Sequence, residues 1–119
     1  MAYVDGFVLA VPTKNLKAYE RMAKNAGKIW LEYGALQFCE CVGDDLNIKG
    51  MMSFNDIVKP KRGETVVFSW IFYKSRAHRD RVNAKVMADP RLAEMMDTKA
   101  MPFDSKRMAY GGFKVLVDL

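Results

Sequence analysis

A chain of 119 residues with 50% hydrophobic content is long enough for one sizeable core, so we expect a single domain over residues 1–119. Its apolar runs are strand-sized and interrupted by polar residues, which excludes a transmembrane helix, and no secretory signal pattern is present, which predicts a cytoplasmic protein. The 19 Lys and Arg against 14 Asp and Glu give a net charge of +5, which favours anionic partners without identifying one.

The first third of the chain predicts a strand, a helix and a second strand. Residues 3–11 are β-rich and apolar on both alternating faces, so both faces need to be covered. Residues 16–33 carry apolar side chains at alternating spacings of three and four, the pattern of an amphipathic helix, and Gly34 is placed to end it. Residues 35–42 have one apolar face and one more polar face, which indicates an edge strand.

Residues 43–63 follow no regular pattern, although they are too apolar for a solvated loop. We expect a packed excursion, with room for one helical turn, or a lid. Its apolar residues are Met51, Met52, Phe54, Ile57 and Val58.

The second half of the chain predicts a strand, two short helices and a final strand. Residues 65–73 form the strongest strand pattern, which indicates a buried, central position. Ser75 is placed to cap a helix, and Asp89 and Pro90 provide the N-cap and first position of a second short helix. Residues 101–113 then lead into a last strand with Phe113 and further apolar residues to position 117 on one face, and its charged residues indicate an edge.

This order, β-α-β-β-α-β, predicts an α+β, ferredoxin-like fold with a four-stranded antiparallel sheet whose first and third strands are central. Two helices cover only one face of such a sheet, so the apolar second face of the central strands needs another partner. A second copy of the chain is the simplest partner, which predicts a homodimer of the dimeric α/β barrel type.

Four segments resemble the YbaA-like family of uncharacterised bacterial proteins, domain of unknown function 1428. They are residues 3–7 (YVDGF), 66–71 (VVFSWI), 89–91 (DPR) and 101–113 (MPFDSKRMAYGGF), of which the last is the most specific. The resemblance implies a dimeric α+β barrel, an architecture also used by small cofactor-independent oxygenases and related ligand binders. It brings no agreed substrate or catalytic residues.

Asp5 and His78 are the catalytic candidates. A carboxylate among apolar residues of a central strand is costly unless paired, so we expect Asp5 to pair with Lys106 or Arg107, with a base of raised pKa as the alternative. Glu40 raises the same question on an edge strand, where access to solvent further favours a structural role over chemistry. His78 lies near a predicted helix N-terminus, which favours a neutral, capping or solvated ring over a general base.

Cys39 and Cys41 lie two residues apart in a predicted strand, about 6.5 to 7 Å from one another, which predicts free thiols. A zinc site would need two further ligands for which the chain has no clear source. We therefore expect no metal and no cofactor.

Arg107 is the preferred contact for a small anionic ligand, because a guanidinium holds a carboxylate or phosphate with two bonds. Tyr110 and Trp70 are candidates for an aromatic wall beside it. The pair Gly111 and Gly112 predicts either a bulge in the edge strand or a close approach by a ligand or another backbone.

Three function classes remain open. The leading hypothesis is a homodimer that binds a small molecule between sheet and helices, with cofactor-independent enzyme chemistry left undecided. A second is RNA binding, because the RRM module shares this element order and stacks bases on central-strand aromatics, although its signature sequence is absent. The residues relevant to RNA are Phe68, Trp70, Phe72, Lys59, Lys61 and Arg62. A third is a non-catalytic protein-interaction or regulatory domain; no membrane association is expected.

Overall fold

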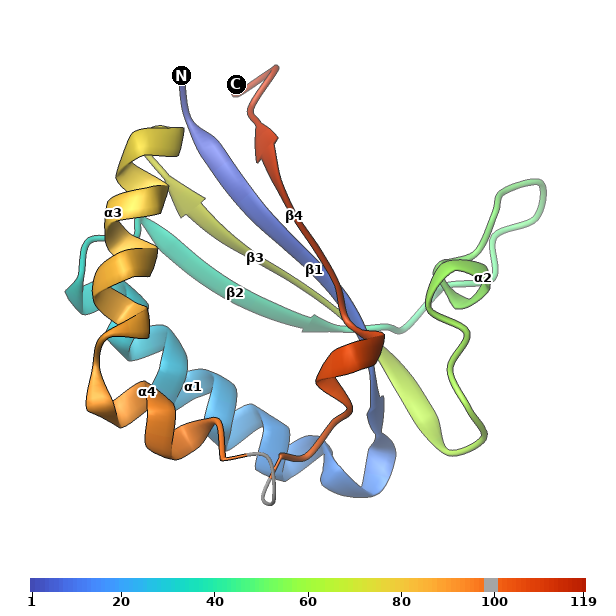
Figure 1. Cartoon of the computed structure of the whole chain (residues 1–119). Helices are drawn as coiled ribbons and strands as arrows, with labels where there is room; N and C mark the ends of the chain where they lie inside the picture. The colour runs from blue at the N-terminus through green and yellow to red at the C-terminus, as the bar shows by residue number, and fades with distance from the viewer. Residues whose placement is uncertain (98–100) are drawn as a thin grey trace.

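Within residues 1–97 and 101–119, which the computed structural model describes, four strands form one antiparallel sheet in the order β2-β3-β1-β4 (Figure 1). The strands are β1 (Tyr3–Pro12), β2 (Gln37–Val42), β3 (Glu64–Tyr73) and β4 (Ala109–Lys114). The long strands β1 and β3 are central and the short strands β2 and β4 are edges. The predicted α+β, ferredoxin-like fold is therefore confirmed.

Of the helices in the described residues, three cover one face of the sheet and a fourth lies on the opposite side, an arrangement that can be followed in Figure 1. The first three are α1 (Leu16–Glu32), which follows the turn η1 (Thr13–Asn15), α3 (Arg76–Met87) and α4 (Pro90–Met95). The fourth is the single-turn helix α2 (Phe54–Val58). None of the helices in the described ranges is long and apolar enough to cross a membrane.

Side-chain caps fix the helix boundaries that the sequence predicts. Ser75 Oγ accepts the backbone N–H of His78 at 3.1 Å, and Asp89 Oδ1 accepts that of Arg91 at 2.8 Å. These bonds satisfy amide donors that lack partners within a helix. Gly34 follows α1 with a φ of +111°, a conformation that glycine adopts without strain.

Alternate side chains of the central strands form the core beneath the helices. Leu9 and Val67 pack with Tyr19 of the first half of α1. Ile71 packs in a second cluster that includes Val82 of α3. Burial of such side chains, at about 1.5 to 3 kcal/mol each, is the main force that holds α1, α3 and α4 on this face, which we call the inner face of the sheet.

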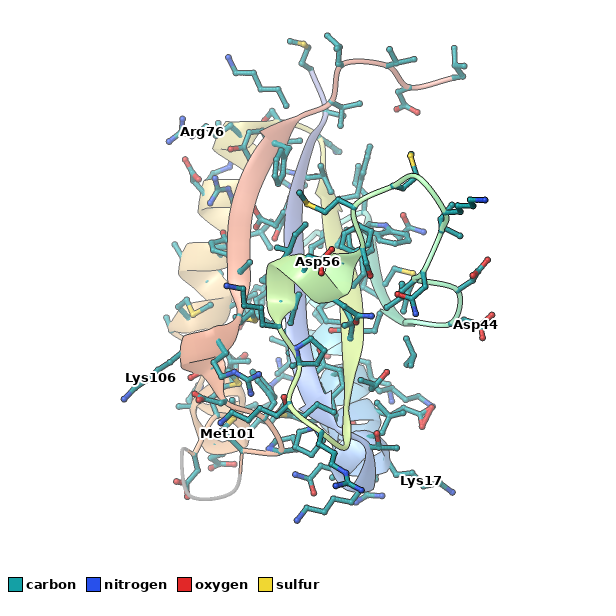
Figure 2. The ribbon with its side chains drawn as sticks, turned by 90° about the vertical axis from the view of Figure 1, so that its right-hand side faces the viewer. Lys17, Asp44, Asp56, Arg76, Met101 and Lys106 are labelled. Atoms are coloured by element: carbon teal, nitrogen blue, oxygen red, sulfur yellow. The ribbon has the colours of Figure 1, made fainter. Side chains whose placement is uncertain are left out.

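The opposite, outer face of the sheet is only partly covered. Phe68 of β3 remains 41% exposed there, although the ring of Phe54 from α2 packs against it with centroids 6.0 Å apart. Figure 2 shows α2 and its loop in front of this face. The segment 43–63 is thus a packed excursion with one helical turn, as predicted, and it lies on the opposite face of the sheet from α1, α3 and α4.

The last strand differs from its prediction. Strand β4 ends at Lys114 and pairs with β1 in an unbroken register from Tyr3 opposite Lys114 to Val8 opposite Ala109, so the glycine pair forms no bulge. A side chain at Gly112 would instead overlap the ring of Tyr3 and the guanidinium of Arg79. The close approach that the glycines permit is therefore made by this protein's own side chains.

Gly27 of α1 sets the spacing between α1 and β2, and its replacement provides a test of the packing. A Cβ atom there would lie 2.6 Å from Cδ1 of Phe38. Helix propensity alone predicts that Gly27→Ala stabilises by about 1 kcal/mol. The overlap predicts the reverse sign, a net loss of about 1 to 3 kcal/mol in the free energy of unfolding, measured with urea.

The matched control is Gly27→Ala in a Phe38→Leu background, where the smaller side chain removes the overlap. In that background, Gly27→Ala is expected to cause no loss in the free energy of unfolding. A stabilising Gly27→Ala in the otherwise unchanged protein would show that α1 does not approach β2 this closely.

Candidate functional site

A cavity of about 110 Å³ lies between the inner face of the sheet and the helices. Its walls are almost entirely apolar, and they are formed by α1, the centre of the sheet, α4 and the segment before β4. The residues that line it include Tyr19, Met22, Ala23, Glu40, Ser69, Met96, Phe103 and Met108. An apolar pocket with a few convergent polar groups is the usual form of a small-molecule site.

Glu40 is the acidic group of this cavity. It lies on β2 directly opposite Ser69, and its Oε2 accepts a hydrogen bond of 2.7 Å from the hydroxyl of Tyr19. The Tyr19 ring is held in turn by an edge-on contact with Phe103, with centroids 5.5 Å apart. Burial raises the pKa of Glu40 above its ordinary value, although the hydroxyls of Tyr19 and Ser69 act in the opposite direction.

A second hollow, a groove of about 450 Å³, lies between α1 and the edge strand β2. Tyr19 and Glu40 line both the groove and the cavity, and the exposed residues Glu20 and Lys24 line the groove. Glu40 thus stands between the two hollows. Its side chain points under α1, where it accepts the hydrogen bond from Tyr19.

Asp5 lies in a separate polar cluster under α3. It is 1% exposed, its Oδ2 accepts a long hydrogen bond of 3.5 Å from Asn83, and its Oδ1 lies 3.7 Å from Nε of Arg79. Arg79 also donates to the hydroxyls of Tyr3 at 3.1 Å and Tyr110 at 3.2 Å. Burial raises the pKa of Asp5, and the charge of Arg79 opposes that rise. The predicted pairing of Asp5 with Lys106 or Arg107 is wrong, since α3 supplies the cation.

Arg107 lies at the end of the turn η2 (Ser105–Arg107) and binds Glu64 through two bonds of 2.8 and 2.9 Å. Its guanidinium also donates to the carbonyl of Lys59 at 3.3 Å. The hydrogen bonds of Arg107 lower the pKa of Glu64 to about 2. The Arg107 guanidinium therefore makes its two hydrogen bonds to a carboxylate of this chain. Arg107 lines neither the cavity nor the groove.

Tyr110 and Trp70 lie on opposite faces of the sheet. The Tyr110 ring stacks on Phe7 of the inner face, with centroids 4.9 Å apart. Trp70 is paired with the residue preceding Phe7, and its Nε1 donates to Gln37 at 3.0 Å on the outer face. The two rings point to opposite sides of the sheet, because neighbouring positions on a strand alternate in direction; Trp70 is among the residues that line the cavity, and Tyr110 is not.

His78 has a local structural contact. Its Nδ1 accepts the backbone N–H of Lys74 at 3.0 Å, which requires an unprotonated nitrogen at that position. Burial, with the nearby charges of Lys74 and Arg81, lowers the pKa of His78. These observations agree with the predicted neutral ring at a helix N-terminus.

The two cysteines form neither a disulfide nor a metal site within the described residues. The Sγ atoms of Cys39 and Cys41 are 3.8 Å apart, and both cysteines are free. No group of three or more His, Cys, Asp or Glu in residues 1–97 and 101–119 is placed to hold a metal ion. The aromatic side chains considered for RNA lie on the outer face, where α2 packs on Phe68.

Sequence reasoning missed Tyr19 and Ser69 as polar groups of the cavity, and Arg79 as the partner of Asp5. One signal for the cavity was available. Glu40 lies two residues after Phe38 on the same face of β2. It is therefore a lone charge on the apolar face of an amphipathic strand. Such a position indicates a buried acid.

Comparison with known proteins assigns the family. The family described as "Protein of unknown function (DUF1428)" matches residues 2–105. The chain belongs to this family. It is 47% identical over 118 residues to "Uncharacterized protein YbaA" of Escherichia coli K12 and of Shigella flexneri, which covers 99% of this chain and of each relative. The resemblance to the YbaA-like family is therefore confirmed.

Solved structures with low sequence identity share the fold. SnoaB of Streptomyces nogalater, described as a cofactor-independent oxygenase, has a TM-score of 0.57 at 11% identity and covers 99% of this chain and 96% of its own. A protein from an uncultured marine organism, described as a dimeric ferredoxin-like protein, has a TM-score of 0.56 at 14% identity and covers 99% and 98%. These likenesses show the ferredoxin-like fold and nothing about activity.

Replacing Glu40 by glutamine tests its buried position. An acid whose pKa is raised on folding stabilises the fold while it is neutral, below its unfolded pKa, and this contribution is lost as pH rises through the folded pKa. Glu40→Gln is thus expected to exceed the unchanged protein in stability at about pH 8, by on the order of 1 kcal/mol because some contact with water remains. Below the ordinary value of 4.5 the difference should vanish.

Urea unfolding of both proteins across this pH range measures the difference. Glu94→Gln, which changes an exposed acid of α4, is the control and should leave stability unchanged at every pH. A Glu40→Gln variant that is less stable at about pH 8 would show that the charged carboxylate is well solvated or well paired.

Proposed function

We propose that this protein is a homodimer that binds a small, neutral and largely apolar molecule in the cavity between sheet and helices. The observation that carries the proposal is an apolar cavity whose lining includes one half-buried acid, Glu40. The apolar walls provide the binding energy, and Glu40 with Tyr19 provides a hydrogen-bonding contact for one polar group of the ligand.

The volume of the cavity limits the size of the ligand. An engineered protein cavity of about 150 Å³ binds benzene, so about 110 Å³ suits a single small ring or a short carbon chain. Met22, Met96 and Met108 line the cavity, and their unbranched side chains adapt to different shapes at low cost. We therefore infer a ligand of one ring or a few carbon atoms.

The charge of the lining supports a neutral ligand. No Lys or Arg occurs among the described residues that line the cavity, and its charged group is the acid Glu40. An anion would enter this cavity without a counter-ion, which is costly in apolar surroundings. Arg107 is bound to Glu64 and does not itself line the cavity, although its neighbour Met108 does. These contacts favour a neutral molecule over the small anion that the sequence indicates.

A matched pair of ring compounds tests this proposal. Phenol is expected to shift the NMR signals of the Met22, Met96 and Met108 methyl groups saturably, whereas benzoate, of similar size but anionic, should bind at least about 10-fold more weakly. Ala23→Leu, which extends a side chain into the cavity, should abolish the phenol shifts.

Ala84→Leu makes the same change on an exposed position of α3 and should leave binding intact. Equal binding of benzoate and phenol, or phenol binding that persists in Ala23→Leu, would contradict the proposed site.

The homodimer is supported by apolar side chains that remain exposed on one side of the molecule. The outer face contributes Phe68 and Phe113, which are 41% and 60% exposed. The excursion contributes Met51 and Met52, at 73% and 77%. An apolar surface of this extent is typical of an interface, and the marine neighbour with this fold is described as dimeric. A second copy packed on the outer face would bury these side chains.

Sedimentation at micromolar concentration tests the dimer. We expect the mass of two chains for the unchanged protein and of one chain for Phe68→Glu, because a buried, unpaired charge on the outer face opposes association. Leu31→Glu is the control, since Leu31 is similarly exposed, at 48%, but lies on α1. A one-chain mass for the unchanged protein, or dissociation caused by Leu31→Glu, would contradict this interface.

A further inference from the structure

Glu40 lies between two hollows of different character. Its carboxyl faces the apolar cavity, where its Oε2 is held at 2.7 Å by the Tyr19 hydroxyl. It also lines the groove between α1 and β2, which the exposed residues Glu20 and Lys24 border. A half-buried acid with one side toward a ligand cavity and another toward a groove with charged residues is placed to exchange protons between them.

We propose that Glu40 is a catalytic base that moves a proton within a small ketone or aldehyde bound in the cavity, interconverting its keto and enol forms. This inference rests on the proposed binding of a neutral molecule in the cavity. It adds a reaction and a substrate class that binding alone does not require.

The substrate class follows from the chemistry of the lining. In a neutral and mostly apolar molecule, a proton that a carboxylate can remove is found on a carbon next to a carbonyl group. Apolar walls exclude water from the carboxylate and make it a stronger base than it is in solution. Burial, which raises the pKa of Glu40, brings that pKa closer to neutral pH, where a general base is most effective.

The proposed step needs no oxidant or reductant. The Glu40 carboxylate forms an O–H bond with the proton, the electron pair of the broken C–H bond forms a carbon–carbon double bond, and the carbonyl π electrons move to oxygen. Return of the proton to that oxygen gives the enol, and return to carbon restores the ketone. Atoms and electrons are balanced in both directions.

The groups around Glu40 affect its pKa and determine how it exchanges its proton with water. From α1 it is faced by Tyr19 and, across the groove, by Glu20 and Lys24; from β3 it is faced by Ser69, and Cys41 lies on its own strand. The groove gives the carboxyl a route for proton exchange with water that does not pass through the ligand. In heavy water, this route would deliver deuterium to the substrate carbon.

Tyr19 acts as a positioning residue. Its hydroxyl donates to one oxygen of Glu40, which orients the carboxyl and favours its charged form. Tyr19→Phe removes this bond and is expected to raise the pKa of Glu40. The acidic limb of the pH–rate profile should therefore move to higher pH, an effect that a purely structural role of Tyr19 would not produce.

Deuterium exchange of cyclohexanone in buffered heavy water, followed by loss of its α-proton NMR signal, tests the inference. The unchanged protein is expected to accelerate exchange over buffer, and Glu40→Gln should reduce the acceleration by about 100-fold or more. Glu94→Gln, an exposed acid on α4, should exchange as fast as the unchanged protein. Methionine methyl shifts in the same samples report whether cyclohexanone binds.

The outcomes separate the reaction from the binding. Binding of cyclohexanone without accelerated exchange, or equal exchange by Glu40→Gln, would overturn the catalytic role while the proposed function stands. Binding of phenol but not of cyclohexanone would overturn the ketone class in the same way. If neither compound binds, both the proposed function and this inference fail.

Discussion

Two central strands that are apolar on both faces are the constraint on which this structure depends. Strands β1 and β3 place Leu9 and Val67 in the core beneath α1, while alternate residues such as Phe68 point to the other side. One face is covered by the helices of the same chain. The other is covered only in part by α2, which leaves an apolar surface that a second copy would bury.

The cavity follows from how the helical layer meets the inner face. Gly27 allows α1 to approach β2 closely at Phe38, whereas one turn earlier Ala23 contributes a small side chain and leaves space above Glu40 and Ser69. That space contains a carboxyl held by Tyr19. A half-buried acid costs stability when charged, and perturbed acids occur both at functional sites and in structural clusters such as that of Asp5.

Periodicity and cap residues were sufficient to predict the fold. A strand that is apolar on both faces, or a helix cap such as Ser75, can be recognised from a few neighbouring residues. The candidate site was less accessible, since it depends on pairs that are distant in the sequence. Arg79 reaches Asp5 only because α3 packs over β1, and Arg107 is bound to Glu64 through the fold of the segment before β4. The parity of Glu40 with Phe38 was a local signal, but its partner Tyr19 lies on another element.

Glu40 is thus a half-buried acid held by Tyr19 beside a cavity that we propose accepts neutral molecules. Carbon-13 NMR titration of the Glu40 carboxyl, without and with saturating phenol, measures this most directly. We expect a pKa above the ordinary value of 4.5, and a further rise when phenol displaces the remaining water from the cavity. A pKa at or below 4.5 that phenol leaves unchanged would contradict the account.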